Sequence, residues 1–502
     1  ARRALMHCAV FAAEITPAAL DAVMGMTGGE SAPALSALAS HSLLRRQGPD
    51  SYALHALIRQ YAAQHLAEEP AATQAAQARH SQYYLAQLCA LDLERMGAGQ
   101  PDALRALDAI FPEVRAAWEW ACAHGAHAQV TPAVHTLYRY ALTRGHAAQA
   151  AALITQLEAA LRGEVDPAAQ RDRGVALARL AWLQHEQSDY QRSRESARAS
   201  AAILKRCAAP DAALAYTVIA ELEAADGAML EARARLDQAR ACPDLRASDR
   251  VWILVSYSQI IGAAGDWAAA RDAAAAGVGI AREADDWLAL ATSLGKLSTI
   301  LMMLEDLPVA ITLASESLDY MRRLDDRRGL AIMLNNLAAA RMLMDGASLQ
   351  VIALMEESLA IDRAIGRPAG IITGIHSLGY VHILLGEYAV AASYLHEGLR
   401  LVPTVGVPAV TLELLEGVGK LLAETARPEA AAALLALVAA HPQTDQYVRE
   451  RAQAVIAASR YAPTPAGAAP LQLEAAVKLA IDALDALTAN LPPPVSAERL
   501  SA

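Results

Sequence analysis

Aromatic residues and cysteines are scarce in this 502-residue chain, which has two Phe and five Cys. The cysteines, scattered from Cys8 to Cys242, form neither a disulfide framework nor the paired spacing of a zinc site, so we expect buried free thiols in a reducing cytosol. Runs of Val, Ile and Thr, which favour strands, are also scarce, whereas the strong helix formers Ala and Leu are abundant. The composition therefore predicts an all-α protein.

The sequence also lacks long apolar segments, a signal peptide and a phosphate-binding loop. No apolar run reaches the ~18 residues of a membrane span, so we expect no membrane partner. A net charge of −11 argues against a general nucleic-acid surface. No G-x-x-x-x-G-K-[ST] sequence occurs, and the nearest stretch, Gly417 to Leu421 (GVGKL), lacks the first glycine. Because Ala1 opens a helical pattern without a preceding Met, we expect the chain to be part of a longer protein.

The stretch from Leu378 to Pro403 predicts two helices that meet at a hinge. Small residues, Gly379 and Ala391, stand where the helices must touch, and we expect Pro403 to close the second helix. The Leu-Gly pair, the Gly-x-Tyr hinge at Tyr388, the Ala three residues later and the closing Pro resemble a tetratricopeptide repeat. This resemblance implies an α-solenoid with a right-handed superhelical twist.

Counterparts of the hinge position recur at near-equal steps of 38 to 43 residues, slightly longer than the usual period of ~34. Eight such positions predict about eight stacked helical hairpins. The hinge positions besides Tyr388 are Ala147, Tyr190, Met229, Trp267, Leu307, Ala347 and Pro428.

Four regions follow from this pattern. Residues 1–68 predict a winged-helix domain, with three helices (2–13, from 17, and 32–40), two extended segments (43–46 and 52–55) around a Gly-Pro-Asp turn, and a helix over 55–68. Residues 69–165 predict a helical bridge with the first hairpin, and residues 166–441 the clearest repeats. Residues 442–502 predict a linker (462–470), a capping helix (471–489) that covers the last repeat, and a frayed tail.

The segment LSALASHSLLRRQGPDSYALHALIRQYAAQHL is similar to the winged-helix module that follows the nucleotide-binding domain of NB-ARC-like STAND proteins, including large bacterial LuxR-type transcriptional regulators. The strings EVRAAWEWA (113–121) and LQLEAAVKLAIDAL (471–484) also look like those regulators. The resemblance implies an upstream NTPase domain in the same chain, ADP or ATP as its nucleotide, a separate output domain and a homo-oligomer as one form of the active state.

Within that resemblance, His55 in Leu54-His55-Ala56 matches the histidine of the Met-His-Asp motif, which contacts the β-phosphate of ADP. A histidine at a helix N-terminus suits a phosphate, although the Asp of the motif is replaced by Ala56. The alternative is a histidine packed against the wing. We interpret Arg45, Arg46 and Arg59 as supports for domain packing, because the helix over 32–40 lacks the side chains that read DNA bases.

The first helix of each hairpin should line a concave face, which is where solenoids bind their partners. Asn336 takes the place at which these repeats often carry an asparagine that hydrogen-bonds a peptide backbone, and amides suit that task for any peptide sequence. Ordinary solvated helix surface is the alternative for each residue. The other candidates are Asn335, Arg341, Lys296, Gln259, His376, Tyr380 and His382.

We therefore expect the sensor part of a STAND-type regulator, which binds a protein, a peptide or a small inducer. The alternative is a free-standing tetratricopeptide adaptor without an NTPase. No acid–base or metal-ligand constellation is evident, so we expect no catalytic residues, no metal and no cofactor in these residues. Two methionine clusters, Met302-Met303 and Met342 with Met344, are predicted to fill the core.

Overall fold

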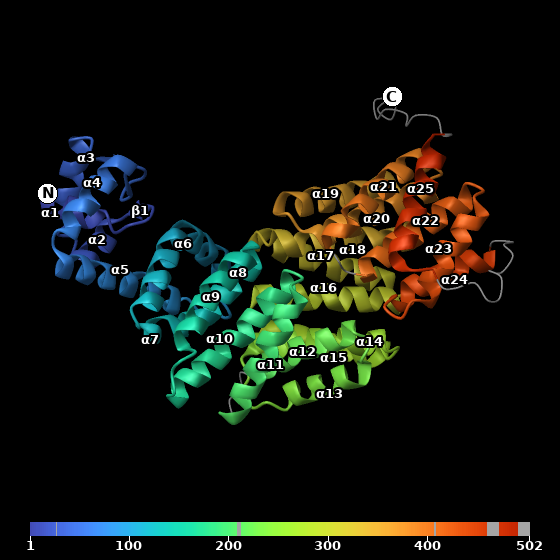
Figure 1. Cartoon of the computed structure of the whole chain (residues 1–502), viewed down its shortest axis with the longest axis horizontal. Helices are drawn as coiled ribbons and strands as arrows, with labels where there is room; N and C mark the ends of the chain where they lie inside the picture. The colour runs from blue at the N-terminus through green and yellow to red at the C-terminus, as the bar shows by residue number, and fades with distance from the viewer. Residues whose placement is uncertain (27, 208–211, 406–407, 459–470, 490–502) are drawn as a thin grey trace. The chain divides into compact units, whose positions relative to one another are not determined.

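The computed structural model describes residues 1–26, 28–207, 212–405, 408–458 and 471–489, and it is an all-α solenoid with one small sheet (Figure 1). Two compact units emerge from the internal contacts. The first comprises Ala1–Ile219, Asp237–Arg250 and Arg282–Trp287, and the second Ala220–Leu236, Val251–Ala281 and Leu288–Ala502. No helix among the described residues combines the length and apolarity needed to cross a bilayer.

The N-terminal module combines four helices with a three-stranded antiparallel sheet of order β1-β3-β2. Thr16 caps α2 as predicted, by accepting a hydrogen bond from the Ala19 amide. The bounds are α1 Arg2–Cys8, β1 Glu14–Ile15, α2 Pro17–Met24, α3 Ala32–Ser40, β2 Leu44–Arg46, β3 Tyr52–Leu54 and α4 Ala56–Ala67.

The prediction of one helix over residues 2–13 was wrong. Helix α1 ends at Cys8, and the chain then forms the short strand β1, which pairs with β3. The amides of Ala12 and Ala13 donate to the Glu113 carboxylate at 2.9 and 2.5 Å, so a distant carboxylate takes the place of helical acceptors. A strand of two residues carries no alternating pattern that sequence could have revealed.

A helical bridge follows and holds the module through Glu113. This carboxylate is 1% exposed and also contacts His80 Nε2 at 2.8 Å. Trp118 is fully buried on the same helix, and its indole donates to the Leu153 carbonyl at 2.8 Å. The bridge elements are α5 Pro70–Ala90, η1 Gly97–Gly99, α6 Gln100–Ala123, α7 His127–Val130 and η2 Thr131–Ala133.

Eight helical hairpins follow in the part of the chain that the structure describes, and the predicted hinges mark the starts of their second helices. Seven of the eight hinge residues are the first residue of such a helix, and the eighth helix begins at Leu349, two residues beyond Ala347. The hairpins are α8 Val134–Arg144 with α9 Ala147–Leu161, α10 Pro167–Glu186 with α11 Tyr190–Arg206, α12 Ala212–Ala225 with α13 Met229–Arg240, α14 Ala247–Ala263 with α15 Trp267–Ala284, α16 Trp287–Met303 with α17 Leu307–Leu324, α18 Arg327–Asp345 with α19 Leu349–Ile365, α20 Pro368–Leu384 with α21 Tyr388–Val405, and α22 Pro408–Glu424 with α23 Pro428–Ala440.

Close approach between the two helices of a hairpin depends on small residues at their contact. A Cβ atom added to Gly379 would lie 2.9 Å from Leu395 Cγ, which is too close for carbon atoms. Ala391 and Leu395 are both fully buried, as the sequence predicted for this contact. Helix α21 runs to Val405, so the prediction that Pro403 closes it was wrong by two residues.

The C-terminal region contains a helix that the sequence analysis missed. Helix α24 (Gln446–Ala458) packs on α22 and α23, and helix α25 (Leu473–Thr488) packs on α21, α22 and α23. The buried face of α25, which includes Ala480 and Leu484, joins the core of the last hairpins. The predicted linker 462–470 lies outside the described residues, as does the predicted tail beyond residue 489.

The five cysteines are free, and only Cys8 is buried. Burial raises the pKa of the Cys8 thiol to about 12. Cys89 is exposed, so the expectation of buried thiols was wrong for this residue.

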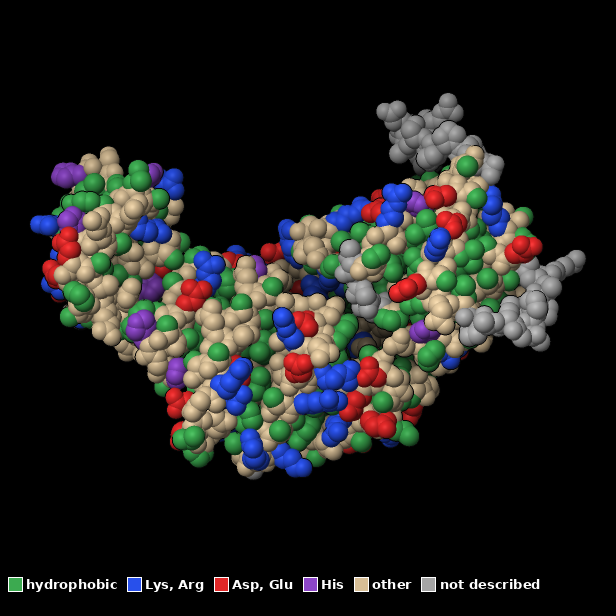
Figure 2. All heavy atoms as spheres, in the orientation of Figure 1, with side chains coloured by type: hydrophobic (Ala, Val, Ile, Leu, Met, Phe, Trp, Pro, Cys, Tyr) green, Lys and Arg blue, Asp and Glu red, His purple; other side chains and the backbone are tan. Residues whose placement is uncertain are grey.

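Acidic and basic side chains are interspersed on the face drawn in Figure 2.

Replacing Ala391 with Leu is expected to lower the free energy of unfolding by about 1–3 kcal/mol, because the larger side chain overpacks a contact between two helices. Urea denaturation followed by circular dichroism measures the change. Ala353→Leu is the matched control, because Ala353 is an exposed alanine on a helix of the preceding hairpin. Equal stability of the two variants would contradict this account of the packing.

Candidate ligand-binding face on the first helices

The first helices of successive hairpins contact one another directly, from α18 to α20 and from α20 to α22, and α22 also contacts α24. These contacts bring side chains from different repeats onto one shared face. Hydrogen bonds cross between the helices at about the spacing of one repeat: Asn336 Nδ2 donates to Thr299 Oγ1 at 3.3 Å, and Lys296 Nζ donates to Gln259 Oε1 at 2.9 Å. The first helices therefore form one polar surface.

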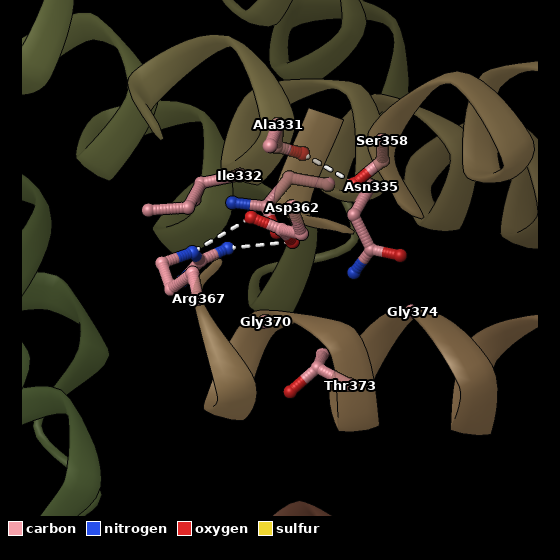
Figure 3. Close-up of a pocket in the computed structure, with 10 residues that line it drawn as sticks. Ala331, Ile332, Asn335, Ser358, Asp362, Arg367, Gly370, Thr373 and Gly374 are labelled. Atoms are coloured by element: carbon pink, nitrogen blue, oxygen red, sulfur yellow. Dashed lines mark hydrogen bonds and ion pairs between the residues drawn. The ribbon is translucent and has the colours of Figure 1, made fainter. Parts of the chain in front are cut away.

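A cavity of about 100 Å³ opens between α18, α19 and α20 (Figure 3). The predicted residues Asn335 and Asn336 both line it, together with Thr373 of α20. Figure 3 shows the Asn335 amide directed toward the segment of α20 that carries Gly370 and Gly374. The cavity is therefore lined by amide and hydroxyl groups from two successive first helices.

A partly buried ion pair also lines the cavity. Asp362 is 2% exposed and accepts two hydrogen bonds from Arg367, from Nε at 2.7 Å and from Nη2 at 2.9 Å. A Cβ atom added to Gly370 would lie 2.4 Å from atoms of both side chains, so a larger residue here would have to displace the pair. Each charge is neutralised by the other, and the cavity offers neutral polar groups to a ligand.

The two asparagines differ in how their polar groups are satisfied. Asn336 is engaged with Thr299, whereas the buried Oδ1 atom of Asn335 has no hydrogen-bond partner among the described residues. A buried acceptor without a donor costs free energy, roughly 1–3 kcal/mol, which a ligand N–H group could recover. The Oδ1 atom of Asn335 is thus the strongest candidate on this face to accept a hydrogen bond from a ligand.

Other predicted residues lie along the same helices. Lys296 is half-buried, and burial lowers its pKa although the charge of Glu221 opposes the shift. Gln259 is exposed. Arg341 is half-buried on α18, and its Nε atom has no partner among the described residues. Lys296 and Gln259 are therefore joined to each other, while Arg341 stands apart from the cavity lining.

A second polar cluster brings together α20, α22 and α24. Tyr380 lies under two cations, with Arg451 at 4.2 Å and Lys420 at 5.5 Å from the ring centroid. His376 is buried with its ring 6.1 Å from that of Tyr380, and its Nε2 lies 3.4 Å from Glu416 Oε2. The predicted residues His376 and Tyr380 are thus brought together, with the His376 side chain buried.

Glu416 holds this cluster together from a fully buried position. Burial alone would raise its pKa, but the hydrogen bond from His376 and the charge of Arg451 outweigh burial and lower it. Arg451 also donates hydrogen bonds from Nε and Nη2 to the carboxylate. Glu413, one turn earlier on α22, keeps a raised pKa because burial dominates there.

Sequence reasoning missed Glu416 and Arg451. Arg451 lies on α24, in a region that we had assigned to a linker, cap and tail. The spacing of Tyr447 and Arg451, four residues apart, places both on one helix face and could have indicated α24. His382, by contrast, is buried beside Tyr394 and bonded to Glu387, away from the candidate surface.

His55 stands at the start of α4, the position that the sequence predicted. It is the N-cap residue, and its Nδ1 atom accepts a hydrogen bond from the Leu57 amide at 3.4 Å. The side chain is exposed and is not buried against the wing. Arg59 on the same helix donates to the Ala12 carbonyl at 2.6 Å, consistent with a role in packing.

No family model matches the chain, and no curated protein matches it by sequence. Similar solved structures include a Rap protein complexed with competence and sporulation factor, with 12% identity, a TM-score of 0.48, and coverage of 65% of this chain and 98% of that chain. A STAND protein with a tetratricopeptide repeat sensor from Pyrococcus horikoshii matches with 14% identity, a TM-score of 0.41, and coverage of 91% of this chain and 62% of that chain. The APC/C hetero-tetramer Cut9-Hcn1 matches with 13% identity, a TM-score of 0.46, and coverage of 80% of this chain and 75% of that chain. At these identities the likeness concerns the helical-repeat fold alone.

Proposed function

We propose that this chain is the sensor part of a STAND-type signal-transduction regulator and that it binds an extended peptide segment on the first helices of its repeats. The observation that carries the proposal is the buried Oδ1 atom of Asn335, which has no hydrogen-bond partner among the described residues. It lies beside Asn336 at a cavity between α18, α19 and α20. An extended peptide exposes N–H and C=O groups that such amides can pair with whatever its sequence. We expect no catalysis from these residues.

In this proposal the N-terminal module is a winged helix that relays the binding event to an upstream nucleotide-binding domain. Glu113 supports the relay, because one buried carboxylate on α6 holds the backbone of Ala12 and Ala13 in the module. His55, exposed at a helix N-terminus, would contact the phosphate of ADP held by that domain. A ligand acts through this route only if it binds one of the two states of the NTPase more tightly.

The binding face is tested by selecting ligands from a random library of 12-residue peptides displayed on phage and by measuring the affinity of a selected peptide. We expect Asn335→Ala and Asn336→Ala each to weaken binding about tenfold without unfolding the chain, since tenfold corresponds to ~1.4 kcal/mol. Gln350→Ala, on the exposed part of α19, is the control and should leave the affinity unchanged. Equal affinities for all the variants would remove this face from the proposal.

The alternative, a free-standing adaptor that holds partner proteins together, shares the same binding face. The mass of the native protein in its own cells separates the two functions, and an immunoblot against this chain measures it. A band well above the 53.0 kDa of these residues supports the sensor function. A band at that mass favours the adaptor, because no nucleotide-binding domain would then accompany the repeats.

A further inference from the structure

Three successive hairpins expose large apolar side chains at the end of their first helices. Leu304 is 38% exposed after α16, Leu343 and Met344 are 46% and 44% exposed at the end of α18, and Leu384 and Leu385 are 48% and 41% exposed at the end of α20. These five residues are called the apolar edge. The prediction that Met344 fills the core was therefore wrong.

The apolar edge is limited to these three hairpins. One hairpin earlier, the residue before the hinge glycine is Ala264, and one hairpin later the corresponding segment reads Glu424-Thr425. Elsewhere on these three helices the apolar residues are largely buried. The exposed apolar residues are therefore a feature of the helix ends and not of the whole helices. Contiguous exposed apolar residues with a polar boundary are typical of an interaction surface.

Acidic residues accompany the apolar edge. Each of the three turns carries at least one exposed carboxylate: Glu305, Asp306, Asp345 and Glu387. Glu387 accepts a hydrogen bond from His382, and the other three have no ion pair among the described residues. The turn segments 304–309, 343–349 and 384–388 contain neither Lys nor Arg. The surface therefore combines apolar contact area with negative charge.

We propose that the apolar edge binds a basic amphipathic helix of a partner protein. Packed helices lie roughly 8–10 Å apart, and seven residues of an α-helix rise about 10.5 Å, so apolar residues at i, i+7 and i+14 of a partner helix can meet successive hairpin ends. Leucine and methionine side chains adapt to different partner surfaces. Lysines and arginines beside the apolar stripe of the helix would face the four carboxylates.

Two other occupants fit the charges less well. An anionic membrane surface would be repelled by the carboxylates that flank the leucines. A second copy of this chain, paired through the same edge, would bring acidic turns against acidic turns. The edge lies at the ends of the first helices and does not include the cavity at Asn335, so this inference does not depend on the proposed function.

The test uses the full 502-residue chain and an 18-residue fluorescent peptide of leucine and lysine, with leucines on one helical face. A peptide of the same composition, with its leucines scattered around the helix, is the peptide control. Leu343→Ser combined with Leu384→Ser removes the centre of the apolar edge. Leu230→Ser is the matched protein control, because Leu230 is 83% exposed on α13, away from the edge.

Fluorescence anisotropy should show that the amphipathic peptide binds at least tenfold more tightly than the scattered peptide. The double serine variant should lose at least tenfold in affinity, while Leu230→Ser should match the unsubstituted chain. Binding should also weaken with added NaCl, and less steeply when Glu305 and Asp345 are replaced by Gln and Asn. Equal binding of both peptides would overturn the inference. It would also be overturned if the chain did not bind the peptide and the same leucines instead mediated self-association or binding to phosphatidylserine vesicles.

Discussion

Replacing Arg139 with Met should lower the free energy of unfolding by about 3–5 kcal/mol, because it breaks a buried ion pair and leaves the buried carboxylate in place. Arg139 is 1% exposed, and its Nη2 lies 2.5 Å from Oδ1 of Asp286, which is fully buried. Without the guanidinium, Asp286 either stays charged at a fully buried position without this ion pair or takes up a proton. Both outcomes cost free energy relative to the paired state.

Neighbouring charges increase this cost. Arg179 forms a buried bidentate pair with Asp249, at 2.6 and 2.9 Å, and stacks 5.0 Å from the Tyr138 ring. The charge of Arg139 also helps to lower the pKa of Glu94, which burial alone would raise. Loss of Arg139 therefore removes a cation from a group of carboxylates that lie out of water.

An exposed ion pair of the same type provides the control. Arg363 and Glu397 also lie 2.5 Å apart, but their side chains are 48% and 45% exposed. Arg363→Met should cost only about 0–1 kcal/mol, because water solvates the remaining carboxylate. Urea denaturation followed by circular dichroism measures both variants. Similar losses for Arg139→Met and Arg363→Met would show that burial does not decide the cost.

The repeat architecture was predictable because the same hinge pattern recurs at one period along the chain. Hinge residues such as Trp267 and Leu307 could be located from their neighbours by counting about 40 residues. Contacts between first helices follow the same period: the bond from Lys296 to Gln259 spans 37 residues and that from His376 to Glu416 spans 40. A partner one repeat away can in principle be found by the same counting.

Contacts that break the period could not be predicted. Arg139 and Asp286 are 147 residues apart, and Glu94 and Ser248 are 154 apart, so no local pattern links them. The predicted Asn335 and Asn336 do reach one cavity, but their division of roles depends on which amide meets Thr299. The exposure of Met344 depends on its place at the end of a helix, which composition does not encode.

Replacing Arg451 with Met should lower the free energy of unfolding by about as much as Arg139→Met. It should also change the pH dependence of that free energy. In the unsubstituted chain the pKa of Glu416 is lowered below 4.5, so its contribution to stability is complete above that pH and is lost as the pH falls through the folded-state pKa. Without Arg451, His376 is the remaining hydrogen-bond partner of the carboxylate among the described residues. Burial then dominates, and the folded-state pKa should rise above 4.5.

The deficit of the Arg451→Met variant should therefore be about 3–5 kcal/mol near pH 7 and should shrink as the pH falls toward 4, because protonation of Glu416 relieves the unpaired charge. Hydrogen exchange of peptides from α22 measures the local stability of this end of the chain directly. Tryptophan fluorescence does not, because all six tryptophans lie at or before Trp287. Lys420→Met is the control, because Lys420 faces the same Tyr380 ring without bonding Glu416 and should cost about 1 kcal/mol or less at either pH. A deficit of Arg451→Met that stays constant from pH 7 to pH 4 would show that the arginine stabilises α24 by packing on the tyrosines and not by compensating the buried charge.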